Sequence, residues 1–449
     1  MIKLLKNSSK YILAGSLVAL LSACGGDDNE GLNSVPDGSA QLVNSIVVDN
    51  VTAQTMLAYV KGAIDVNATN AFSTKAVKIS YNTLNQNGES IVASGLLVIP
   101  TPTEAYKAYL ASIGKTFSVS MICDNHGTIF QDSDAPTNVE KTNGVPDYPL
   151  SILMSGYAGF AAIYPDYIGF GDSNTTVHPY ILKKAAGQAS LDMVRASMKY
   201  MEEEGILLNH QLYITGYSEG GYNAMALAQK AENELTTVNI KGIAPMAGPY
   251  NVEDLADIEI DENRKMVYPA FLADLAYAYS NYYSDFNLDE VAVAPEIKFQ
   301  IAFNGSYDTV YIHTILGLAN PTATPPDYGF FIHSTTELFQ VSFIKDYVDN
   351  LNSVARNRFI ENNLDNWTPK SKINLIQCLD DEIIPFSESN NTYNKFKTNG
   401  VDVTLTGIPT ALLSQQVDAL HPFVHANCGA TAYGAAVKWF AGIRSGDIK

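Results

Sequence analysis

The stretch that decides the fold reads Leu212-Tyr213-Ile214-Thr215-Gly216-Tyr217-Ser218-Glu219-Gly220-Gly221. It begins as a β-rich run and continues into a helix predicted from Glu219 to about Ala231, so Ser218 stands where a strand turns sharply into a helix. Glycine at 216 and 220 removes side chains that would collide in so tight a turn. The N–H groups at the start of the helix point toward the site and favour an anion there. The pattern predicts a nucleophilic serine; the alternative is a glycine-rich turn with an incidental serine.

Around this motif, short β-rich runs alternate with helical periods, which predicts an α/β fold with a mostly parallel central sheet and helices on both faces. A hairpin opens the pattern, with Asn-Gly between Ala76–Tyr81 and Ser90–Ile99. The alternation stops in the tyrosine-rich residues 250–369, which we interpret as a helical lid or cap insertion. Residues 41–249 and 370–449 then form the two parts of the core, the last helix running from about Ala430 to Ile443.

The N-terminus has the layout of an export signal. Three lysines precede the apolar run Tyr11–Leu21, so residues 1–23 are predicted to be a signal peptide, too short for a permanent membrane span. Leu21-Ser22-Ala23-Cys24 resembles a bacterial lipobox, which predicts lipidation of Cys24 and a polar tether over residues 24–40. An ordinary signal peptide with an incidental Cys24 is the alternative. We therefore expect an exported protein anchored by lipid to the cell envelope, at the outer membrane if the source is Gram-negative.

Composition narrows the possible partners. The 449 residues carry 28 basic and 47 acidic side chains, a formal charge of −19, which disfavours nucleic acid because its phosphates would be repelled. Hydrophobic types make up 46%, enough for a large core, which excludes disorder for most of the chain. With four cysteines, seven histidines and no phosphate-binding loop or paired-histidine motif, we expect neither a metal nor a cofactor.

Chain order then identifies an acid and a base. Where a serine sits on this kind of turn, an acid and then a histidine follow it along the chain. Only His421 and His425 follow the last predicted strand, and we prefer His425, placed on the loop just ahead of the final helix. For the acid we choose Asp381, four residues before a proline, over Asp380, with a merely solvated acidic loop as the alternative. His126 comes too early in the chain to be the base.

The remaining site predictions concern the oxyanion and the cysteines. An oxyanion hole needs two prearranged N–H donors, for which we name Glu219 and Thr128, the latter in the turn after an early strand. Cys378 lies three residues before Asp381, and Cys428 three after His425. Because these two loops must meet for catalysis, we predict a Cys378–Cys428 disulfide that leaves Cys123 free and buried.

Several motifs together give a family resemblance. They are Tyr164-Pro165-Asp166-Tyr167-Ile168-Gly169-Phe170-Gly171, His178-Pro179-Tyr180, Ser190–Ala196 and the Ser218 motif. From about Ala76 onward the chain resembles the secretory lipases, the fungal lipase-A-like α/β-hydrolases and their bacterial lipoprotein relatives. The resemblance implies hydrolysis of acyl esters, with the insertion acting as a lid. One departure is Gln377-Cys378, where many relatives have His-Gly or a glycine.

The leading hypothesis is a serine carboxylic ester hydrolase of lipase or esterase type, acting on a lipid or small-molecule ester, in which the tyrosine-rich insertion supplies an apolar acyl-binding wall. Core packing of those tyrosines is the alternative for each of them. A second hypothesis is a prolyl-type or aminopeptidase-type peptidase, with Glu203 or acidic lid segments holding the substrate amine. A third is a non-catalytic surface lipoprotein on a hydrolase fold.

Overall fold

The computed structural model describes residues 41–64, 71–138, 141–142, 145–146, 153–318, 332–413, 417 and 423–448. The predicted signal peptide, the tether with Cys24, and His421 lie outside these residues. Among the helices of the described ranges, none combines the length and the apolar composition that crossing a bilayer requires.

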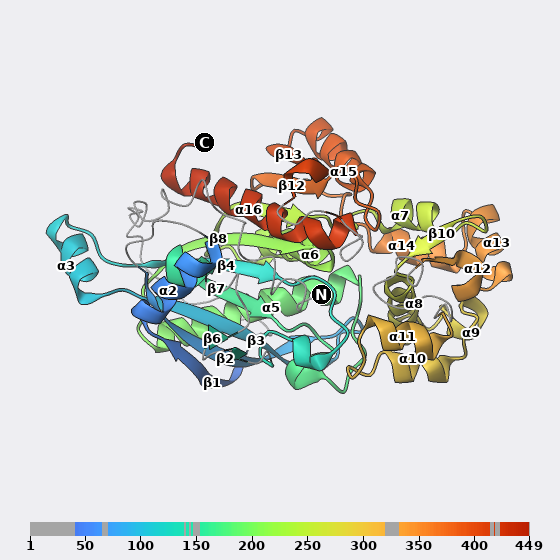
Figure 1. Cartoon of the computed structure of the whole chain (residues 1–449), viewed down its shortest axis with the longest axis horizontal. Coiled ribbons are helices and arrows are strands. Elements are labelled where there is room, and N and C mark those ends of the chain that lie inside the picture. Colours follow the sequence, from blue (N-terminus) through green and yellow to red (C-terminus); the bar gives the residue numbers. More distant parts are fainter. Residues whose placement is uncertain are drawn as a thin grey trace.

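A nine-stranded sheet forms the centre of the molecule (Figure 1). Strands β1 to β3 and β7 pair antiparallel, whereas β7, β4, β8, β9, β12 and β13 pair in parallel. The predicted hairpin is present, with Gly88 at φ 85° in its turn. In spatial order the strands are β1 (Leu42–Val51), β2 (Ser73–Leu84), β3 (Ser90–Thr101), β7 (Phe160–Pro165), β4 (Val119–Asn125), β8 (Leu208–Tyr217), β9 (Asn239–Met246), β12 (Ile373–Cys378) and β13 (Val403–Ile408).

Helices cover both faces of this sheet, as the alternation of side chains along the central strands requires. On β8, Leu212 and Ile214 pack in one hydrophobic cluster with α5 (Lys183–Glu203) and α6 (Glu219–Glu234). Tyr213 between them packs in a second cluster with α16 (Val424–Ser445). The predicted α/β fold with covered faces is confirmed.

The segment between β9 and β12 is mainly helical and gathers at the right-hand end of the molecule in Figure 1. It also contains one short antiparallel pair, β10 with β11, which the sequence pattern did not predict. Its elements are α7 (Val252–Glu259), β10 (Lys265–Val267), α8 (Ala270–Tyr282), α9 (Leu288–Val291), α10 (Glu296–Ala302), α11 (Thr309–Leu316), β11 (Ile332–Ser334), α12 (Thr335–Leu338), α13 (Val341–Asp349) and α14 (Val354–Glu361).

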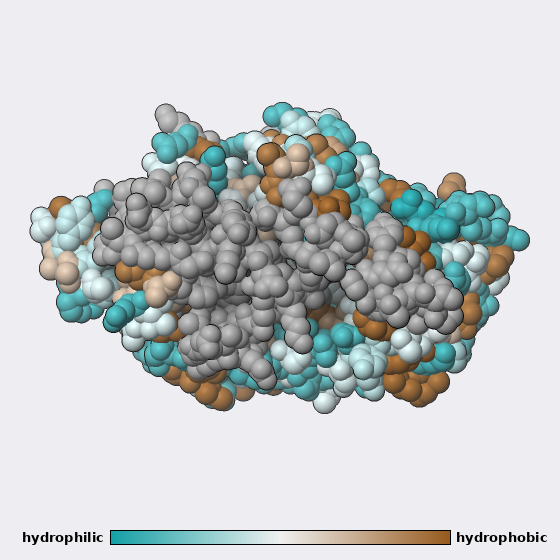
Figure 2. All heavy atoms as spheres, in the orientation of Figure 1, coloured by the Kyte–Doolittle hydropathy of each residue, from teal (hydrophilic) through white to brown (hydrophobic). Residues whose placement is uncertain are grey.

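Apolar side chains also reach the outer surface of this segment. Figure 2 shows apolar residues at its lower edge, where α10 and α11 lie in Figure 1. Ile297 and Ile301 on α10 are 57% and 42% exposed, and Tyr311 on α11 is 60% exposed. The segment therefore presents apolar surface outward as well as toward the sheet.

The remaining elements are smaller and mostly peripheral. They are α2 (Ala53–Ile64), α3 (Glu104–Ser112), η2 (Asp132–Asp134), β5 (Lys141–Thr142), β6 (Val145–Pro146), η3 (Leu153–Tyr157), η4 (Gly171–Ser173), α15 (Phe386–Thr398) and η6 (Thr410–Leu412). Strand β1 was not predicted either. Its side chains are mostly exposed, so it has no apolar alternation that would reveal a buried face.

Candidate active site

Ser218 lies at the point where β8 ends and α6 begins, in a backbone conformation with φ 61° and ψ −124°. Left-handed φ values are strained for a residue with a side chain, and such strain is typical of functional sites. The flanking glycines are needed for space. A Cβ on Gly216 would lie 2.2 Å from the carbonyl oxygen of Gly220, and one on Gly220 would lie 1.9 Å from that of Asn125. The turn can therefore press against the end of β4 only with glycine at both positions.

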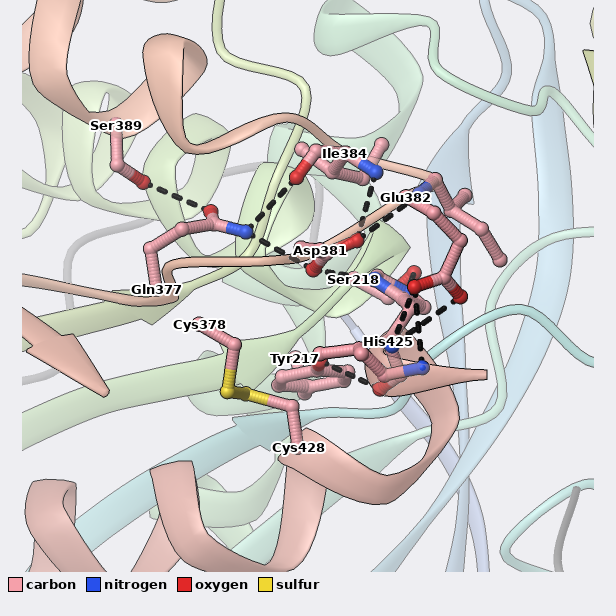
Figure 3. A network of polar contacts seen from close by, with 12 residues as sticks. Tyr217, Ser218, Gln377, Cys378, Asp381, Glu382, Ile384, Ser389, His425 and Cys428 are labelled. Carbon is pink, nitrogen blue, oxygen red and sulfur yellow. Dashed lines mark hydrogen bonds and ion pairs between the residues drawn. A yellow bond between two sulfur atoms is a disulfide. The ribbon is translucent and has the colours of Figure 1, made fainter. Parts of the chain in front are cut away.

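The structure brings Ser218, His425 and Asp381 into one line of contacts (Figure 3). Nε2 of His425 lies 2.9 Å from Oγ of Ser218, and Nδ1 lies 2.8 Å from Oδ2 of Asp381. His425 is fully buried, and Ser218 is 7% exposed. Asp380, the other acid considered, is exposed and accepts a hydrogen bond from the Thr410 hydroxyl instead.

The Asp381 carboxylate receives hydrogen bonds at both oxygens. The backbone N–H groups of Ile383 and Ile384 donate to Oδ1 at 3.0 and 2.9 Å, and the side-chain amide of Gln377 donates to Oδ2 at 2.9 Å. Gln377 is itself fixed, because it also donates to the Ile384 carbonyl and accepts from the Ser389 hydroxyl at 3.0 Å. Sequence reasoning missed Gln377 as a partner of the acid. Its only signal was the departure from the pattern of the resembling family.

The final helix corrects one prediction. It begins at Val424, six residues earlier than expected, so His425 lies in the first turn of α16 rather than on a loop. The carboxylate of Glu382 accepts hydrogen bonds from the N–H groups of Val424 and His425, at 3.0 and 3.3 Å. A carboxylate at a helix N-terminus accepts hydrogen bonds from backbone N–H groups that have no acceptor within the helix, and its negative charge interacts favourably with the helix dipole. A cap contributed by a residue 42 positions away cannot be read from local sequence.

Tyr217, the residue before the nucleophile, contacts both the backbone and the ring of His425. Its hydroxyl donates to the backbone carbonyl of His425 at 2.7 Å, and the two rings lie 5.1 Å apart. The residue before the nucleophile therefore holds the helix that carries the base. Nothing in the spacing of the serine motif indicated this role.

Cys378 and Cys428 are joined by a disulfide, and Cys123 is a free, buried thiol. The bond links the end of β12, just before Asp381, to the first turns of α16, just after His425 (Figure 3). It thus joins the two segments that carry the acid and the base.

The two residues named for the oxyanion hole belong to segments that lie next to Ser218. Glu219 is the first residue of α6, so its N–H is among those without an acceptor inside the helix. The turn that contains Thr128 also approaches the serine, since a Cβ on Gly127 would lie 3.6 Å from the Ser218 Cβ. Thr128 is buried, and its hydroxyl lies 3.0 Å from that of Tyr180.

An apolar cavity of about 920 Å³, solvent at its mouth included, extends from Ser218 into the helical segment. The helical segment supplies most of the apolar wall of this cavity, but the aromatic rings in that wall are mostly phenylalanines. Within the described residues, Tyr268 is the only tyrosine of the insertion that lines it. Tyr277 and Tyr279 pack in the core instead. The phenylalanines are Phe271, Phe286, Phe339, Phe343 and Phe359. In the described part of the chain, no group of three or more histidine, cysteine or acidic side chains could hold a metal ion.

The nine-stranded sheet with its covered faces and the serine at a strand-to-helix turn together define the α/β-hydrolase fold. Residues 147–279 match the family model described as secretory lipase, which covers the serine motif and the motifs on which the resemblance rested. No curated protein matches the chain.

Solved structures share the fold at low identity. A structure from Legionella pneumophila aligns with a TM-score of 0.73 and 21% identity over 91% of this chain and 99% of the other. The rice cell wall degrading esterase LipA from Xanthomonas oryzae gives 0.70 and 21% over 88% and 96%. Candida antarctica lipase A, in its closed state, gives 0.55 and 14% over 84% and 78%.

Proposed function

We propose that the protein hydrolyses carboxylic esters through a Ser218–His425–Asp381 triad and an acyl-enzyme intermediate. The observation that carries this proposal is the 2.9 Å contact between Nε2 of His425 and Oγ of Ser218, with Asp381 on the other ring nitrogen. That geometry suits a general base poised to activate a hydroxyl.

In the proposed reaction, Nε2 of His425 takes the Ser218 proton while Oγ attacks the ester carbonyl. The resulting oxyanion is stabilised by N–H groups, for which Glu219 and Thr128 are our candidates. The imidazolium then returns the proton to the departing alkoxide, which leaves as the alcohol. Water, activated by the same histidine, cleaves the acyl-enzyme and releases the carboxylic acid. Asp381 holds His425 in the tautomer whose Nε2 is free and stabilises the imidazolium.

The apolar cavity favours an acyl chain as one half of the substrate. Its lining within the described residues includes no lysine, arginine or histidine, so it offers no cationic side chain to pair with an anionic group on the substrate chain. The matching family is described as secretory lipase, and two solved relatives of the same fold are an esterase and a lipase. We propose that the helical segment between β9 and β12 is the lid of this site. We also propose that the protein is exported and that Cys24 is lipidated.

Peptidase activity would require an acid that holds a substrate amine. Glu203 is exposed at the end of α5 and pairs with Lys199 at 3.5 Å. Glu259, which does line the cavity, pairs with Arg264 at 2.8 Å. Glu203, the clamp named from the sequence, and Glu259 of the insertion are therefore each already paired with a cation, which disfavours them as clamps for a substrate amine.

The test is a substrate profile with p-nitrophenyl esters of increasing acyl length beside aminoacyl-p-nitroanilides, with Ser218→Ala as the blank. Each methylene that enters the cavity should raise kcat/KM by up to about fourfold, from about 0.8 kcal/mol per buried CH₂. A fluorophosphonate probe should label wild type at Ser218. Faster cleavage of anilides than of esters would support the peptidase, and failure to label a folded protein would support the non-catalytic alternative.

A pH profile gives a second prediction. Burial alone would lower the pKa of His425, but the carboxylates of Asp381 and Glu382 reverse this effect and raise it. Because only neutral His425 can take the serine proton, kcat/KM should rise with pH through that raised pKa and reach its plateau above the ordinary range of histidine. Glu382→Gln keeps an oxygen for the helix N–H groups but removes a charge, so the acid limb should move to lower pH. An unmoved limb would contradict the role given to Glu382.

A further inference from the structure

Two motifs that the triad does not use, Tyr164–Gly171 and His178-Pro179-Tyr180, meet beside the nucleophile. Nε2 of His178 lies 2.9 Å from Oε1 of Glu219, the residue directly after Ser218. Two residues further along the chain, the Tyr180 hydroxyl lies 3.0 Å from Oγ1 of Thr128. A single three-residue segment therefore contacts both residues named for the oxyanion hole.

The segment is held in place by its surroundings. Pro179 restricts its backbone, and Gly169, at φ 97°, allows it a close approach, since a Cβ there would lie 2.6 Å from the His178 Cα. The hydroxyl of Tyr279 on α8 donates to the carbonyl of Ile181, the next residue, at 3.2 Å. The hydroxyl of Tyr222 on α6 lies 3.3 Å from the same carbonyl and 2.9 Å from that of Asn362, to which it donates. These contacts fix His178-Pro179-Tyr180 relative to α6 and α8, and thereby fix the positions of the side chains that the segment contacts.

Hydrogen-bond partners determine the charge of His178. Its Nδ1 lies 2.7 Å from the backbone carbonyl of Ile168, and its Nε2 faces the Glu219 carboxylate. Both partners are acceptors, whereas a neutral imidazole has only one N–H to donate. With Glu219 ionised, both contacts are satisfied only when the ring carries two protons and is a cation.

The charged groups that face this ring support the same conclusion. They are Glu219 on α6 and Asp274 on α8, while the Tyr164–Gly171 motif contributes the Ile168 carbonyl. Burial would lower the pKa of His178, but Glu219, Asp274 and the carbonyl outweigh it and raise the pKa. Asp274 is itself buried, which raises its pKa to about 7.

We propose that His178-Pro179-Tyr180 positions the oxyanion hole, the His178 imidazolium holding and neutralising Glu219 while Tyr180 holds Thr128. The proposal rests on the ester hydrolysis proposed above. A bare carboxylate on the residue after the nucleophile would oppose the negative charge that forms on the substrate carbonyl oxygen. The imidazolium cancels that charge, and the two contacts keep the N–H donors aimed before the reaction begins.

The kinetic test compares His178→Gln with the double variant His178→Gln/Glu219→Gln. His178→Gln should lower kcat by roughly 10- to 100-fold, less than the 10²–10³ typical of a lost donor, with KM within about threefold of wild type. Removing the uncompensated carboxylate as well should restore about tenfold, a rescue that a merely structural role would not give. Tyr180→Phe should lower kcat by about fivefold, as expected for one hydrogen bond.

His333→Gln is the matched control, because it removes another buried histidine paired with a glutamate, 2.9 Å from Oε2 of Glu337, and should leave kcat near wild type. The positioning role is overturned if His178→Gln keeps kcat within twofold, changes KM alone, or is not improved by Glu219→Gln. If His178→Gln does not fold, the kcat of Tyr180→Phe and the NMR measurement described next still test the positioning role.

Nitrogen-15 NMR of the histidine rings tests the charge without using activity. In wild type, both His178 nitrogens should stay protonated to higher pH than in free histidine, and Glu219→Gln should lower the pH at which one proton is lost. A neutral His178 ring in an active wild type overturns the inference alone. A wild type that cleaves no ester while its His178 stays charged overturns the proposed function, and with it the oxyanion-hole role, but leaves the charge assigned to His178 standing.

Discussion

Replacing Asp381 by Asn is expected to lower kcat for ester hydrolysis by about 10⁴-fold, because it forces the wrong tautomer on His425. The N–H groups of Ile383 and Ile384 both donate to Oδ1, so an amide at this position must place its oxygen there. Its NH₂ group then faces Nδ1 of His425, which must become an acceptor. The ring proton moves to Nε2, the nitrogen that has to receive the Ser218 proton.

The control is Asp380→Asn, one residue away. Asp380 is exposed and bonds to Thr410 rather than to the triad, so its variant should keep kcat within about twofold of wild type. KM values measured together with kcat separate a loss of chemistry from a loss of substrate binding. A loss of tenfold or less in Asp381→Asn, or an equal loss in both variants, would refute Asp381 as the acid of the triad.

Removing the disulfide with Cys378→Ser/Cys428→Ser is expected to lower the free energy of unfolding by about 4 kcal/mol. The two cysteines are 50 residues apart, and closing a loop of that length reduces the entropy of the unfolded chain by about this amount in the chain-entropy model. Wild type should therefore melt at lower temperature in the presence of reductant, whereas the double variant should melt at the same temperature with and without it.

Cys123→Ala provides the comparison, since it removes the free buried thiol and should leave the effect of reductant intact. Mass mapping of the unreduced protein should recover Cys378 and Cys428 in one linked peptide. A free Cys378, or a melting temperature that reductant does not change in wild type, would count against the bond.

Much of the architecture was predictable because it depends on local pattern. The Asn-Gly hairpin, strand β12 from Ile373 to Cys378 and the strand-to-helix turn at Ser218 all follow from side-chain alternation and turn residues within a few positions. Strand β1 was not predicted because its side chains are mostly exposed and so show no alternation of apolar and polar residues. The start of α16 was missed because its cap, Glu382, comes from another segment.

The phenylalanine lining of the cavity is another feature that local sequence pattern could not predict. The sequence draws attention to the ten tyrosines between residues 250 and 369, but nine phenylalanines fall in the same range. Which face of each helix turns toward Ser218 depends on how the helices pack. That packing placed Tyr277 and Tyr279 in the core and several phenylalanines at the cavity.

By itself, the sequence determined the α/β layering and, as predictions, a nucleophile at Ser218 and the order in which acid and base follow it. These depend on backbone geometry that neighbouring residues dictate. Only the tertiary structure decided that Gln377 steadies Asp381, that Glu382 caps the helix of His425, and that His178 faces Glu219. Such contacts join side chains from separate segments, and their distances depend on how the whole sheet and its helices pack.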